Sequence, residues 1–116
     1  IQYAHARICS LEKKAGLKNF LAEDISEDHV NMCSNLIHEI SKYPNVLEKT
    51  CNNLSPHLLI FYLRDLASIF HNFYNGNKIL DKSESEKLTI LAVTHAIKEV
   101  IADSLNLLGV KALEEM

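Results

Sequence analysis

Residues 54–75 read LSPHLLIFYLRDLASIFHNFYN, and this stretch decides the fold of the chain. Ser55 followed by Pro56 is a strong helix start, because a capping hydroxyl then precedes a proline at the first helical position. Apolar residues recur every three or four positions, which predicts one long amphipathic helix that runs to about Asn75 and ends at Gly76. The side chains that we expect to form its buried stripe are Leu59, Leu63, Leu66, Phe70 and Phe73.

The rest of the sequence predicts four further helices and no notable strand. We expect these helices at residues 2–15, about 27–42, about 44–51 and from a Ser83 cap to about Leu108. Pro44 separates two of them, and Ser83 with Glu86 forms a capping box. Gly109 is well placed as a C-cap, with Val110 folding back onto the last helical turn.

Each of these helices has an apolar side that should face the interior. The inward-facing residues that we expect are Ala4, Ile8 and Leu11, then Val30, Cys33, Ile37 and Ile40, then Val46 and Leu47, then Leu91, Ile97, Ile101, Leu105 and Leu108. Ser26 is a possible cap for the second helix.

Length and composition agree with one all-α domain over residues 1–116. The 116 residues fit a single domain with one sizeable core, and only three glycines and two prolines are present. Apolar residues make up 47% and charged residues 23%, which is ordinary for a globular domain. The predicted architecture is an antiparallel bundle of about five helices joined by short loops.

The cysteines and the start of the chain bear on its cellular context. Cys9, Cys33 and Cys51 are odd in number and widely spaced, so we expect no disulfide framework and a reducing, cytoplasmic compartment. No apolar run approaches the roughly 20 residues of a membrane span. Ile1 is not an initiator methionine, which favours a fragment of a longer protein over the alternative of a processed terminus.

No catalytic motif is present in the sequence, and a metal site is only geometrically conceivable. His5 and Cys9, and likewise His29 and Cys33, are four residues apart, so each pair shares a helical face. No short Cys-x-x-Cys or His-x₃-His clip accompanies them, so we expect no metal and interpret these cysteines as small core residues.

The candidate binding residues lie at the end of the long helix and on the first helix. His71, Tyr74 and Asn75 project away from the core side, and Tyr3 and Arg7 lie four residues apart. Exposed rings and a guanidinium form a stacking platform for unpaired bases, at about 1–3 kcal/mol per base. The alternative is that Tyr74 packs at the edge of the core and that Tyr3 and Arg7 form an ordinary surface pair.

The net charge of −3 weighs against binding driven by phosphates alone. It leaves open the recognition of a few splayed bases by stacking and edge contacts.

Three segments resemble a known family: IQYAHARICS at residues 1–10, the stretch at 54–75, and LNLLGVKALEEM at 105–116. In this order and spacing they are similar to the C-terminal anticodon-binding domain of arginyl-tRNA synthetases, of the DALR type in class I. Residues 17–53 contribute little to the resemblance.

The resemblance implies an all-helical domain that binds the anticodon loop of arginine tRNA and follows the catalytic domain of the same chain. It places the RNA contacts on Tyr3, Arg7, Tyr74 and Met116, with His71 and Asn75 in the same motif region. It implies no cofactor in this domain, no DNA and no membrane partner, because ATP, Mg²⁺ and the ligase reaction belong to the catalytic domain. The HIGH and KMSKS signatures of class I enzymes are absent from this sequence.

The chain departs from the family pattern in its last helix and tail. Leu113 stands where the family commonly has proline, Glu115 where it has arginine, and Asp103-Ser104 where Asn-Gly is common. These changes put identical contacts in the tail in doubt. Two rival interpretations are a helical protein–protein interaction domain without RNA binding and a small metal-binding helical protein.

Overall fold

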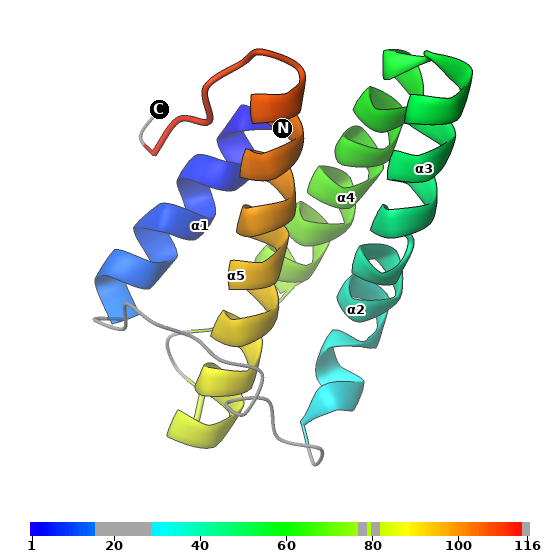
Figure 1. Cartoon of the computed structure of the whole chain (residues 1–116). Helices are drawn as coiled ribbons and strands as arrows, with labels where there is room; N and C mark the ends of the chain where they lie inside the picture. The colour runs from blue at the N-terminus through cyan, green and yellow to red at the C-terminus, as the bar shows by residue number, and fades with distance from the viewer. Residues whose placement is uncertain (16–28, 77–78, 80–81, 115–116) are drawn as a thin grey trace.

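A computed structural model describes residues 1–15, 29–76, 79 and 82–114 of the chain. Within these ranges the chain forms only helices and connecting turns, which confirms the all-α prediction (Figure 1). The elements are α1 (Gln2–Ala15), the 3-10 helix η2 (Val30–Cys33), α2 (Ser34–Ser41), α3 (Tyr43–Asn53), α4 (Pro56–Gly76) and α5 (Glu84–Leu107). None of the described helices is both long and apolar enough to cross a membrane.

The helices form an elongated bundle of about 44 × 29 × 24 Å. Helix α1 lies along α5 and runs in the opposite direction, and α3 lies along α4 (Figure 1). The red tail after α5 turns back toward the blue start of α1, so these two segments lie at the same end of the bundle (Figure 1).

Helix α4 supplies a large share of the core, as its apolar period predicts. Leu59, Leu63, Leu66 and Phe70 are buried, which confirms four members of the expected stripe, whereas Phe73 is only half-buried. The core also includes Tyr62 of this helix, whose hydroxyl donates to the Glu39 carbonyl at 2.7 Å.

Most other predicted core residues are confirmed, with a few exceptions. Those that are buried are Ala4, Ile8, Leu11, Cys33, Leu91, Ile97, Ile101 and Leu105. Ile37, Ile40, Val46, Leu47 and Leu108 are only half-buried. Val46 and Leu47 are less buried than predicted, although Val46 packs against the core, and the buried residue of α3 is Thr50.

The second predicted helix is the least accurate element. Residues 27 and 28 and the proposed Ser26 cap lie outside the described residues, as does the side chain of Val30. The described part begins with the 3-10 turn η2, and α2 starts only at Ser34. The turn ends at Cys33, the residue before α2, whose side chain makes no capping hydrogen bond, so no local signal marks the change of helix type.

The ends of α5 follow the predicted caps. The Ser83 hydroxyl accepts from the Glu86 backbone N–H at 3.3 Å and donates to the Glu86 carboxylate at 3.0 Å. At the other end Gly109 has a φ of +82°, and its N–H donates to Asn106 while that of Val110 donates to Leu105. This pair of bonds is a Schellman motif, which needs the left-handed conformation that glycine adopts without strain.

Asp103 and Ser104, which depart from the family pattern, connect α5 to α3. The Tyr43 hydroxyl donates to the Asp103 carboxylate and accepts from the Ser104 hydroxyl, both at 3.2 Å. The Tyr43 ring stacks on that of Tyr62 at 6.0 Å between centroids. This departure therefore serves the packing of the bundle, on the side of α5 that faces α3.

A carboxylate that the sequence did not single out fixes α1 against α5. Glu12 is buried, and its two oxygens lie 2.7 Å from His95 Nδ1 and 2.7 Å from Lys98 Nζ. Because all three side chains are largely shielded from water, this pairing is stronger than a surface ion pair.

We expect Glu12→Gln to lower the free energy of unfolding by about 2–3 kcal/mol, because charge-assisted hydrogen bonds are lost and Lys98 loses its neutralising partner. Urea unfolding followed by far-UV circular dichroism measures this. The matched control is Glu99→Gln, since Glu99 contacts the other nitrogen of His95 at 3.3 Å but is exposed, and it should change stability by less than about 1 kcal/mol. Equal effects of the two substitutions would contradict the prediction.

Candidate nucleic-acid interface

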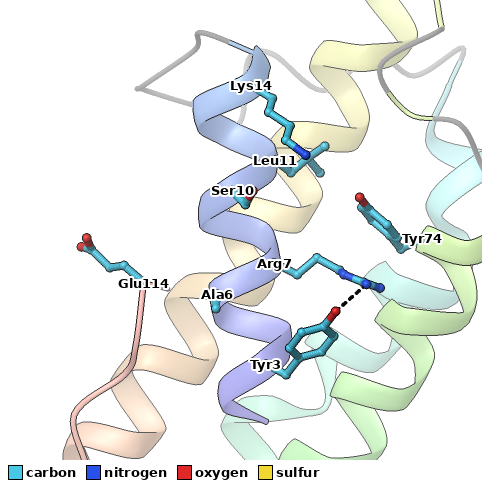
Figure 2. Close-up of a pocket in the computed structure, with 8 residues that line it drawn as sticks. All are labelled: Tyr3, Ala6, Arg7, Ser10, Leu11, Lys14, Tyr74 and Glu114. Carbon is cyan, nitrogen blue, oxygen red and sulfur yellow. Dashed lines mark hydrogen bonds between the residues drawn. The ribbon is translucent and has the colours of Figure 1, made fainter. Parts of the chain in front are cut away.

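Helices α1 and α4 bring four of the predicted binding residues together. Tyr3 and Arg7 lie one helical turn apart on α1, and His71 and Tyr74 lie near the end of α4. Figure 2 shows the Arg7 side chain reaching from α1 across to α4, between the rings of Tyr3 and Tyr74. The two halves of the site are about 70 residues apart in the sequence and depend on the packing of α1 against α4.

Arg7 is the central group of this arrangement. Its Nη2 donates to the Tyr3 hydroxyl at 2.7 Å. Its Cζ lies 4.7 Å from the centroid of the Tyr3 ring and 4.5 Å from that of the Tyr74 ring. These are cation–π distances, and each contact contributes about 0.5–1 kcal/mol at a partly exposed site.

His71 and the buried Phe70 support the two tyrosines from behind. The His71 ring lies 5.4 Å from Tyr3 and 5.5 Å from Phe70, and the Phe70 ring lies 5.9 Å from Tyr74. Each of five side chains therefore contacts the next, and the last contacts the first. We call this set the ring cluster: Tyr3, Arg7, Tyr74, Phe70 and His71. Since Phe70 is fully buried, the cluster is anchored directly on the core.

The ring cluster opens onto a surface hollow of about 470 Å³. The hollow is lined by Tyr3, Ala6, Arg7, Ser10, Leu11, Lys14, Tyr74 and Glu114 (Figure 2). Two cations and one carboxylate line the hollow, so its net charge is more positive than that of the chain as a whole. Tyr3 is 48% exposed, which leaves much of its ring open to a ligand.

The surroundings of His71 in the ring cluster lower its pKa. Burial lowers the pKa of His71 below its usual 6.5, and the nearby Arg7 guanidinium lowers it further. The neutral imidazole is therefore favoured in the folded chain, where it offers a flat ring without a second positive charge beside Arg7.

We expect this shift to make the folded chain less stable in mild acid. The unfolded chain takes up a proton at His71 near pH 6.5, before the folded chain does, so stability is lost as the pH falls from about 6.5 through the lower folded pKa. Urea midpoints at pH 7.5 and 5.5 measure the loss, and His71→Gln should show a smaller one. An identical pH dependence in both proteins would refute the assignment.

The structure places the remaining predicted residues less centrally. Asn75 is exposed at the end of α4, beside Tyr74 in the sequence. Met116 lies outside the described residues, as does Glu115, so the structure places neither. Contact of any of the six predicted residues with RNA stays a prediction.

Sequence reasoning missed Lys14 and Glu114 as residues lining the hollow. The signal for Lys14 was present, because positions 3, 7, 10 and 14 repeat at the spacing of one helical face. Glu114 had no such signal, since its place depends on the path of the tail after α5. Among the described residues, no group of three or more His, Cys, Asp or Glu side chains could hold a metal ion, although His5 Nδ1 and Cys9 Sγ are 3.8 Å apart.

Comparison with known proteins connects this geometry to a family. The model of the DALR anticodon binding domain matches residues 1–116. The chain belongs to this family. The arginine–tRNA ligase of Bordetella avium is 39% identical over 118 residues, and that of Burkholderia thailandensis is 37% identical over 122 residues; both alignments cover the whole chain.

A solved structure agrees with the family in three dimensions. The arginyl-tRNA synthetase of Thermus thermophilus matches 99% of the chain with a TM-score of 0.83 and 26% sequence identity. The chain spans about a fifth of the length of these ligases: 21% of the Bordetella protein, and 20% of the Burkholderia and Thermus proteins. The family and its helical fold are therefore established for the chain.

Proposed function

We propose that the chain recognises the anticodon loop of arginine tRNA on behalf of an arginine–tRNA ligase. The observation that carries the proposal is the ring cluster, in which two tyrosine rings and one guanidinium meet at an open hollow. Flat side chains beside an open surface are the elements that proteins use to bind unstacked RNA bases. Membership of the DALR anticodon binding domain family supports this choice over a protein–protein interaction domain.

Codon structure suggests which base is bound. Every arginine codon has G in the middle, so every arginine anticodon has C in the middle, and one reader of that base serves all arginine tRNAs. In the proposed mechanism the loop unstacks, and its middle base stacks on Tyr3 or Tyr74. Neighbouring amides such as Asn75 and backbone groups then hold the edge of the base.

The charges around the hollow suit a contact with few phosphates. Arg7 and Lys14 are the two cations that line it, and Glu114 reduces their combined charge. The proposed complex therefore depends on stacking more than on phosphate contacts, and its affinity should fall only gently with salt. Arg7 serves first as a stacking group, because its guanidinium is already engaged with both rings.

The wider assignments rest on the relatives. The attachment of arginine to tRNA, with ATP and Mg²⁺, is proposed for the four-fifths of such ligases that the chain does not match. The catalytic domain is the proposed protein partner and the cytoplasm the proposed location, as for an enzyme of translation.

Fluorescence titration of a labelled anticodon stem–loop tests the proposal. Two stem–loops that differ only in the middle anticodon base, C or G, are titrated into the chain at low and moderate salt. The C form should bind more tightly at both salt concentrations. Binding of both forms with equal strength, or of neither, would instead favour the protein-interaction alternative.

A further inference from the structure

The segment after α5 is tied to the first turn and a half of α1 by three hydrogen bonds. Gln2 Nε2 donates to the Lys111 carbonyl at 2.8 Å, and Gln2 Oε1 accepts from the Leu113 N–H at 2.9 Å. His5 Nδ1 lies 2.6 Å from the Leu113 carbonyl. Because a carbonyl only accepts, His5 carries its proton on Nδ1.

We propose that Gln2 and His5 form a latch that holds residues 111–114 on α1 and thereby makes this segment a preformed part of the RNA-binding surface. The inference rests on the proposed function and deepens it. Gln2 and His5 are positioning residues in this scheme, because they act through the backbone of the tail.

The geometry of the latch supports this role. Its two residues flank Tyr3 in the sequence, so the tail is fixed beside the turn that carries one of the stacking rings. The held segment ends with Glu114, which lines the same hollow as Tyr3, Arg7 and Tyr74. The latch therefore joins the last described residues of the chain to the proposed site.

All three latch bonds go to the tail backbone. These bonds therefore use no side chain of the tail, which accounts for a held tail with leucine at position 113. The Leu113 N–H is itself one of the donors, and proline at this position would have no such group.

A preformed tail favours binding because its ordering precedes contact with RNA. Fixing the backbone of a flexible residue has an entropic cost, and a segment ordered only on binding subtracts that cost from the affinity. Residues 111–113 follow the Schellman motif and are not part of a helix. The hydrogen bonds of the latch therefore fix this segment in place of helical hydrogen bonds.

Amide hydrogen exchange measured by NMR tests the latch itself. Gln2→Leu keeps a side chain of similar length and removes both of its hydrogen bonds, so the Leu113 amide should exchange at least about tenfold faster, the factor expected for one lost hydrogen bond. The Val110 amide is the internal control, because it donates to Leu105 within the α5 cap and should keep its rate. Unchanged exchange at Leu113 would overturn the latch.

Stem–loop titration of the same chain tests its positioning role. Gln2→Leu and His5→Phe should each weaken binding of the arginine anticodon stem–loop by roughly tenfold. Asn52→Ala, at an exposed position of α3, should bind like the wild type. His5 is buried, so if His5→Phe fails to fold, Gln2→Leu alone decides.

The outcomes separate the latch from the proposed function. If Tyr74→Ala weakens binding but Gln2→Leu does not, the positioning role is overturned while the proposed function stands. If the wild type does not bind the stem–loop at all, the proposed function fails and the positioning role fails with it. The exchange rate of Leu113 then still decides whether the latch holds the tail.

Discussion

Tyr74→Ala should weaken binding of the arginine anticodon stem–loop by up to about 3 kcal/mol, or roughly a hundredfold. The substitution removes a ring that contacts both Arg7 and Phe70, so it takes away a proposed stacking face and one side of the support for the guanidinium. Fluorescence titration measures the change. Circular dichroism should show an unchanged helical spectrum, because Tyr74 is only half-buried.

Tyr74→Phe is the matched control, since it keeps the ring and removes the hydroxyl. If stacking dominates, this variant should retain most of the affinity. A loss as large as that of Tyr74→Ala would show that the hydroxyl makes the contact instead. Wild-type affinity in the alanine variant would remove Tyr74 from the binding surface.

Phe70→Ala should lower the free energy of unfolding by about 3–5 kcal/mol. The Phe70 side chain is fully buried in the core and also carries the rings of His71 and Tyr74. Alanine leaves a cavity, so the variant loses both the core contacts of the phenyl ring and the support of the ring cluster. The expected loss is a large part of the roughly 5–15 kcal/mol that stabilises a typical domain. Urea unfolding measures the change.

Ser68→Ala provides the control for that measurement. Ser68 lies two residues earlier on α4 and is exposed, so its replacement should change stability by less than about 0.5 kcal/mol. A Phe70→Ala variant as stable as Ser68→Ala would mean that the core around Phe70 closes over the missing ring.

The long helices could be predicted from sequence because their signals are local. The residue range of α1 and the caps of α5 follow from apolar spacing, from Ser83 with Glu86, and from Gly109. The burial of Tyr62 could not be predicted, because its hydroxyl is satisfied by a carbonyl on another helix. Glu12 was missed for the same reason, since both of its partners lie on α5.

The candidate site could likewise be predicted from the sequence only in part. The Tyr3–Arg7 pair follows from a spacing of four residues on one helix, and the hydrogen bond between them is of that kind. The contact of Arg7 with Tyr74 joins two helices, so spacing could not predict it, and only the family resemblance placed both residues at one site. The latch likewise depends on how the tail folds back onto α1, and no local sequence pattern predicts that path.

The position of Arg7 has a consequence for the chain before any RNA arrives. A planar cation lies close to both tyrosine rings, 4.7 Å from the centroid of Tyr3 and 4.5 Å from that of Tyr74. A nucleobase is also planar, so it can stack on the same rings that the guanidinium now contacts. Entry of a base would then exchange one flat group for another, whereas lysine, which has no plane, could not stack on the rings in place of Arg7.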